Sequence, residues 1–95
     1  MFVSALRIEL RLVEVRSLKT KRAILRPILR RLKAMELSVS EVDHQDAWQR
    51  ATLGVAVVAP HAGRLDEIDA RVQRSLLDDT SIEVIEMDVT HMEVS

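Results

Sequence analysis

Residues 6–12, LRIELRL, place an aliphatic side chain at every second position, with an arginine or a glutamate between them. This alternation is typical of a β-strand with one buried face and one polar face. Residues 17–35, SLKTKRAILRPILRRLKAM, change to a helical period in which apolar side chains recur every three or four positions. Ser17 can cap that helix, and Pro27 predicts a kink rather than a break. The first unit of the fold is therefore a strand followed by an amphipathic helix.

The rest of the chain predicts four more elements. Residues 36–43 have enough β-branched side chains for a second strand, and residues 50–59 predict a third, largely buried one. Residues 44–49, HQDAWQ, then form a hairpin loop. After Pro60, a second amphipathic helix is expected to direct these apolar side chains to the core: Ala62, Leu65, Ile68, Val72 and Leu76. Residues 82–94 predict a fourth strand whose apolar face carries Ile85, Met87 and Val89.

The order strand, helix, strand, strand, helix, strand is that of the ferredoxin-like α+β fold, a four-stranded antiparallel sheet with both helices on one face. A chain of 95 residues has room for one core, so residues 1–95 are expected to form a single domain. No stretch approaches the ~20 apolar residues of a membrane span, and the N-terminus lacks the continuous apolar segment of a signal peptide. Because the chain also contains no cysteine, a cytoplasmic protein without membrane attachment is expected.

The first helix concentrates the positive charge. The net charge is −1, yet residues 16–33 contain eight of the fourteen lysines and arginines and no acid. Like charges at i and i+4 repel each other, and lysines at a helix N-terminus oppose the helix dipole, so this pattern costs the helix stability. A basic surface that reaches a helix N-terminus suits phosphate binding. The residues expected to bind RNA phosphates are Arg16, Lys19, Lys21, Arg22, Arg26, Arg30 and Lys33.

Five of these cations fall on one side of the helix beside its apolar face, and we call them the basic stripe: Lys19, Arg22, Arg26, Arg30 and Lys33. Arg16 stands at the entrance of the stripe. The alternative interpretation is a solvated face whose charges pair with the acids of other elements, and the sequence alone leaves both open.

Enzymatic chemistry finds little support. Asp43, His44 and Asp46 do not have the spacing of a metal site, and the chain has no Gly-rich phosphate loop, nucleophile elbow or cysteine nucleophile. Acylphosphatases share the fold class but need an asparagine on a central strand, and the chain contains none. We therefore expect no enzyme, no metal and no cofactor. The open sheet face also lacks aromatic side chains for base stacking, so contacts to RNA are expected to be led by its backbone.

Two motifs, SLKTKR (17–22) and EVDHQDAWQRATLGVAVV (41–58), resemble the YlxP-like family of bacterial proteins, a domain of unknown function. The resemblance covers essentially the whole chain and implies a ferredoxin-like fold, with no assigned activity or cofactor. Genes of this family commonly lie among translation and transcription genes, which implies a role near the ribosome, such as assisting small-subunit maturation. The positions that match the motifs are Ser17, Leu18, Lys19, Lys21, Arg22, Glu41, Asp43, Gln45, Asp46, Trp48, Gln49, Arg50 and Gly54.

Strand direction is expected to bring both motifs to one end of the sheet. The first strand enters its helix at that end, and the second strand returns there before the hairpin loop. Trp48 should therefore lie on the same rim as Ser17, Lys19 and Lys21. It could anchor the edge of the core or offer a stacking surface for a base. Asp43 and Asp46 could pair with Lys19, Lys21 or Arg22.

The sequence thus predicts a non-enzymatic RNA- or ribosome-associated protein that binds phosphates through the basic face of the first helix. Ribosomal RNA or a ribosomal subunit is the expected partner. The alternative is a protein-interaction module, including a homodimer, that uses the open sheet face or an edge strand. Small residues such as Thr52, Gly54 and Ala56 would let another surface approach that face closely.

Overall fold

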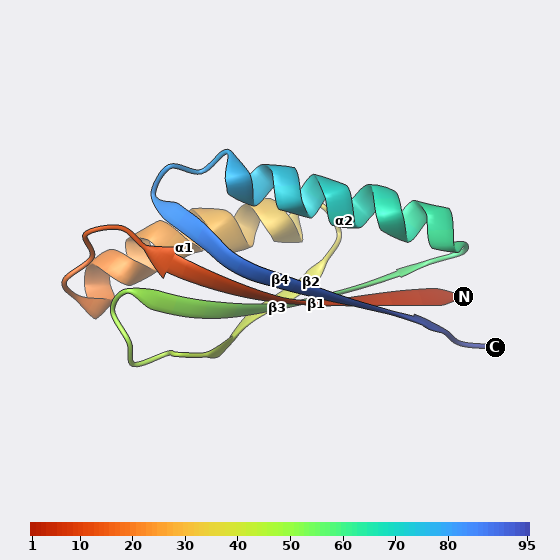
Figure 1. Ribbon diagram of the computed structural model, residues 1–95, viewed down its shortest axis with the longest axis horizontal. Coiled ribbons are helices and arrows are strands. Elements are labelled where there is room, and N and C mark those ends of the chain that lie inside the picture. The colour runs from red at the N-terminus through yellow and green to blue at the C-terminus, as the bar shows by residue number, and fades with distance from the viewer.

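The computed structural model of the protein describes residues 1–95. Its elements are β1 (Phe2–Leu12), α1 (Leu18–Lys33), β2 (Ser38–Asp43), β3 (Arg50–Ala59), α2 (Ala62–Leu77) and β4 (Ile82–Glu93). The strands form one antiparallel sheet in the order β2-β3-β1-β4, and both helices cover the same face of it (Figure 1). The predicted ferredoxin-like α+β fold is confirmed. Neither helix combines the length and hydrophobicity that crossing a membrane requires.

Strand β1 organises the core because it pairs with β3 on one side and with β4 on the other. Its aliphatic residues Leu6, Ile8, Leu10 and Leu12 face the helices and are at most 3% exposed. Burying one side chain of this size contributes about 1.5–3 kcal/mol, so this alternating stretch is a main source of stability. The strand starts earlier than the alternation predicts, at Phe2.

Helix α1 begins where the sequence predicts. The hydroxyl of Ser17 accepts a hydrogen bond from the backbone N–H of Thr20 at 3.1 Å, which caps the first turn. Leu25, Ile28 and Leu32 are buried against the sheet. The helix continues through Pro27 to Lys33, so the proline does not break it. No acid lies in the first turn to complement the positive end of the helix dipole.

Two predicted apolar positions are wrong. Ala62 opens α2 at an exposed position, although the other four predicted residues of that helix are buried. The pairing of β4 with β1 shifts its register beside Glu9, and Ile85 is left in a bulge with an exposed side chain. One inserted residue reverses which side chains of β4 face the core before and after the bulge. A strict alternation read from the sequence does not include such a shift. Val89 lies opposite Leu6 of β1, on the predicted face, but its side chain is partly open to solvent because β4 is an edge strand.

Asp79 ties the end of α2 to α1 and β4. Its carboxylate accepts hydrogen bonds from the hydroxyl and the backbone N–H of Ser81, and it lies 3.5 Å from Nη2 of Arg31. Partial burial raises the pKa of Asp79, but the hydrogen bonds from Ser81 and Arg31 outweigh it. The pKa therefore lies below its usual value of 3.8.

We expect Asp79→Asn to lower the free energy of unfolding at pH 7. Because the folded protein has the lower pKa, the carboxylate stabilises the fold above pH 3.8, and this contribution is lost as the pH falls through the folded pKa. Urea unfolding should therefore show a deficit for the variant at neutral pH that shrinks toward about pH 2. Asp78→Asn, which alters an exposed neighbour, is the control. A deficit that stays the same at both pH values would contradict this assignment.

Candidate nucleic-acid interface

The hairpin loop of residues 44–49 lies against the first turns of α1, at the same end of the sheet (Figure 1). Nζ of Lys21 donates hydrogen bonds to the carbonyl oxygens of His44 at 2.6 Å and Ala47 at 2.7 Å. The same ammonium lies 2.8 Å from Oε2 of Glu41 on β2. The predicted meeting of the two motifs is confirmed, and one buried ammonium joins them into a structural unit.

Lys21 is therefore not a surface cation. Its side chain is only 2% exposed, and its three donors already face three oxygens of the chain. The prediction that Lys21 binds phosphate is wrong. The position of Lys21 in the sequence could have indicated its burial, because it lies three residues after Leu18 and four before Leu25, in phase with the apolar face. Its carboxylate partner is Glu41 rather than Asp43 or Asp46.

The basic stripe lies on the outer surface of α1. All five of its residues are exposed, as is Arg16, and none of the six forms an ion pair. Six of the other eight lysines and arginines do form one. The remaining two, Arg71 and Arg74, are exposed on α2. The structure therefore contradicts the alternative interpretation, in which acids of other elements pair with the stripe.

A polar network covers the open sheet face near the hairpin loop. Thr52 on β3 is fully buried there, and its hydroxyl donates to Oε2 of Glu9 at 2.9 Å and lies 2.9 Å from Nδ1 of His44. Arg7 lies 3.1 Å from the Glu9 carboxylate and Arg50 lies 3.7 Å from it. These residues come from β1, β3 and the loop, so their spacing along the chain gave no sign of the network. Arg50, one of the positions that match the second motif, is held within this network.

Asp43 shapes the start of the loop. Its carboxylate accepts a hydrogen bond from the backbone N–H of His44 at 2.7 Å, and His44 has a left-handed φ of 60°. This hydrogen bond, together with the nearby charges of His44 and Arg7, lowers the pKa of Asp43 below 3.8. A side chain that bonds the backbone of the next residue is a common way to hold such a turn. Asp43 therefore positions the loop.

Gly54 does not leave the open sheet face free for a partner. A Cβ atom added to Gly54 would lie 2.9 Å from Cγ1 of Val42 on the neighbouring strand. Glycine at this position makes room for a side chain of the same chain. Because Thr52 is also covered, the expected close approach of another surface over Thr52 and Gly54 is wrong. Ala56 remains exposed.

Trp48 lies on the surface of the rim. It is 52% exposed. This exposure does not match an anchor that is buried at the edge of the core, and it leaves the ring accessible. The next residue, Gln49, fixes the loop instead, because its side-chain amide donates to the carbonyl oxygen of Val15 at 3.2 Å. Gln45 and Asp46 of the same loop are also exposed.

Comparison with known proteins identifies the family. Residues 3–89 match the family model described as "Protein of unknown function (DUF503)". The chain belongs to the DUF503 family. It is also 38% identical over 78 residues to the uncharacterized protein YlxP of Bacillus subtilis (strain 168), which covers 81% of this chain and 82% of that protein. The resemblance of the two motifs to the YlxP-like family is thereby confirmed.

A solved structure shares the fold of this DUF503 chain. The crystal structure of the candidate chlorite dismutase TA0507 superimposes with a TM-score of 0.53 at 11% identity. The alignment covers 96% of this chain but only 44% of that protein, so the chain spans less than half of its length. At this level of identity the likeness concerns the fold alone.

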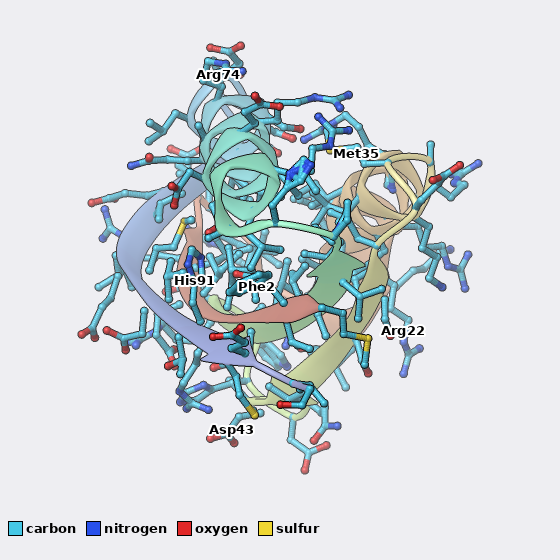
Figure 2. The ribbon with its side chains drawn as sticks, turned by 90° about the vertical axis from the view of Figure 1, so that its right-hand side faces the viewer. Phe2, Arg22, Met35, Asp43, Arg74 and His91 are labelled. Carbon is cyan, nitrogen blue, oxygen red and sulfur yellow. The ribbon has the colours of Figure 1, made fainter.

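The DUF503 chain also brings Asp66, Asp69 and His91 together, with one ligand atom of each within 4.8 Å of the others. Nε2 of His91 lies 2.6 Å from Oδ2 of Asp69, whose other oxygen accepts a hydrogen bond from Ser4 at 2.8 Å. Figure 2 shows His91 on β4, below α2. The sequence gave no spacing that relates His91 to these acids. The structure accounts for the cluster as a contact that ties β4 to α2 and β1.

Proposed function

We propose that this DUF503 protein is a non-enzymatic cytoplasmic protein that binds single-stranded RNA of the ribosome or of a ribosomal subunit through the basic stripe. The observation that supports it is the unpaired state of the stripe, five exposed cations on one helix with no carboxylate partner. Cations at i and i+4 destabilise a helix by a few tenths of a kcal/mol per pair. A polyanion that neutralises them removes this cost.

The stripe has the dimensions of a backbone-binding surface. From Lys19 to Lys33 the helix rises about 21 Å, at 1.5 Å per residue, which is long enough to follow several phosphates. Arg16 and the free backbone N–H groups of the first turn extend the positive surface beyond Lys19. Phosphate contacts of this kind give affinity without reading the base sequence.

The test of this proposal is a salt titration with a labelled single-stranded RNA of about 16 nucleotides, the upper end of known site sizes. If the five stripe residues each neutralise one phosphate, the slope of log K against log salt should be roughly −3.5. The affinity should then fall about 100-fold between roughly 50 and 200 mM salt. A slope near zero would contradict the proposal.

Charge reversal at two matched pairs of positions distinguishes RNA binding through the stripe from a general effect of net charge. The double variant Arg22→Glu, Arg26→Glu is expected to lose most of its RNA affinity, because it removes two phosphate contacts and repels the strand. The control variant Arg71→Glu, Arg74→Glu changes the net charge by the same amount, at the two unpaired cations of α2. It should retain most of the RNA affinity. Figure 2 shows that Arg22 and Arg74 project from different sides of the molecule. Equal losses of affinity in the two variants would contradict the assignment of RNA binding to α1.

Trp48 is expected to stack on a base at the end of the strand nearest the hairpin loop. Because its ring is half exposed, Trp48→Ala should change the free energy of unfolding little and weaken RNA binding by roughly 1–3 kcal/mol. Trp48 is the only tryptophan of the chain, so quenching of its fluorescence reports the contact directly. Val58→Ala, at an exposed position on β3, is the control. A large loss of stability with unchanged affinity would instead assign Trp48 a structural role.

A second candidate function is self-association through the end of the open sheet face away from the loop. The register places Val58 of β3 and Met92 of β4 on either side of Val3, and both outer side chains are largely exposed. Light scattering of the purified protein measures its mass directly. A dimer that Val58→Glu dissociates and Arg22→Glu, Arg26→Glu leaves intact would support this function, and a monomer would exclude it.

A further inference from the structure

A groove of about 230 Å³ runs between the first half of α1 and the end of β2. Leu18, Leu25 and Leu29 of α1 give it an apolar wall. Its volume is several times the share of one water molecule, which is about 30 Å³. It lies below the roughly 300–1,000 Å³ of pockets for drug-sized ligands. The groove therefore suits a single flat ring system.

The polar side chains of the groove come from both of its sides. Arg22 and Arg26 of the basic stripe line it from α1, while Glu41 and Gln45 line it from β2 and the loop. Oε2 of Glu41 is buried and lies 2.8 Å from Nζ of Lys21, in an orientation that makes no hydrogen bond. A carboxylate can only accept hydrogen bonds, whereas the Gln45 amide can also donate. Because Oε2 is buried against Lys21, the acceptor that a base could reach is the other oxygen of Glu41, which is not buried. The groove thus combines apolar surface, two free cations and one accessible carboxylate oxygen.

We propose that this groove receives one unstacked base of the bound RNA strand, with the adjoining phosphates on Arg22 and Arg26. The inference rests on the proposed function, because the stripe brings the strand to the groove. Sequence-specific RNA recognition commonly uses splayed bases that stack on apolar or guanidinium surfaces and bond through their edges. Arg22 and Arg26 can provide such a guanidinium plane beside the leucine wall.

The chemistry of Glu41 sets a preference among the bases. An acceptor favours a base that presents an amino group, as cytosine does at N4, where uracil presents a carbonyl oxygen. Oligo(C) and oligo(U) of equal length carry the same backbone charge, so the stripe contributes equally to both. We expect oligo(C) to bind at least about five-fold more tightly than oligo(U) at the same salt concentration.

The test compares these two oligonucleotides by fluorescence anisotropy with the full chain and with two variants. Glu41→Gln keeps the shape of the side chain and adds a donor, so the preference for oligo(C) should fall to near one. Gln45→Ala should weaken oligo(C) binding without changing the slope of log K against log salt. Thermal melting shows whether Glu41→Gln folds, and Gln45→Ala replaces it as the test variant if it does not. An unchanged preference in a folded Glu41→Gln would overturn the base site.

The outcomes separate the two proposals. Equal, salt-dependent binding of oligo(C) and oligo(U) by the unmodified chain would overturn the groove inference and leave the basic stripe as the RNA-binding surface. Absence of salt-dependent binding to either oligonucleotide would overturn the proposed function and the groove inference with it.

Discussion

Lys21→Met is expected to lower the free energy of unfolding by about 3–5 kcal/mol, the usual effect of removing one partner of a buried ion pair. The ammonium of Lys21 satisfies two carbonyl oxygens of the hairpin loop and faces the carboxylate of Glu41. Methionine retains the apolar stem of the side chain but leaves that carboxylate without its cation. A domain of this size has a total stability on the order of 5–14 kcal/mol, so the variant should be close to unfolding.

Urea unfolding followed by circular dichroism measures this loss. Lys19→Met is the matched control, because Lys19 lies on the same helix but is exposed and forms no ion pair. Its effect should stay within about 0.5 kcal/mol, as is usual for surface positions. Adding Glu41→Gln to Lys21→Met should recover part of the loss by removing the unpaired charge. If Lys21→Met were as mild as Lys19→Met, the ammonium would not hold the two motifs together.

The variant with Lys19, Arg22, Arg26 and Arg30 all changed to Glu is expected to lose single-stranded RNA binding by at least about 100-fold at about 0.1 M salt. Only Lys33 of the basic stripe would remain, so the slope of log K against log salt should fall from roughly −3.5 to about −0.7. The introduced carboxylates also repel the phosphates. The loss should therefore exceed that of any single neutral substitution in the stripe.

The fold of this variant is expected to persist, because all four positions are exposed and none of the four side chains forms an ion pair. Glutamate at position 19 lies near the positive end of the helix dipole, where an acid contributes about 0.3–1 kcal/mol. Anisotropy titrations measure the binding, and thermal melting of the same sample shows whether the variant is folded. A folded variant that binds RNA as tightly as the original chain would show that the stripe is only solvated surface.

The fold could be predicted from the sequence because its core depends on local periodicity. The buried face is indicated by the alternation of residues 6–12 and by the helical spacing of residues 17–35. The structure confirms both faces. The bulge at Ile85 could not be predicted, because it arises from the pairing of β4 with β1. Lys21 illustrates another limit: its residue type indicated solvent, whereas its helical phase indicated the core.

The candidate site could be predicted only in part. Exposure of the basic stripe follows from helical spacing, and the shared rim of the two motifs follows from strand direction. The absence of ion pairs on the stripe needed the positions of the acids, most of which lie on other elements. The bonds of Thr52 to Glu9 and His44 join residues separated by 43 and 8 positions, and the groove between α1 and β2 is likewise a product of packing.

The measurement that tests the central claim most directly is the binding of purified protein to isolated small ribosomal subunits at low and moderate salt. The original chain is compared with the variant in which Lys19, Arg22, Arg26 and Arg30 are changed to Glu. The basic stripe predicts salt-sensitive binding by the original chain and its loss in the folded variant. Failure of the original chain to bind, or equal binding by both proteins, would contradict the claim.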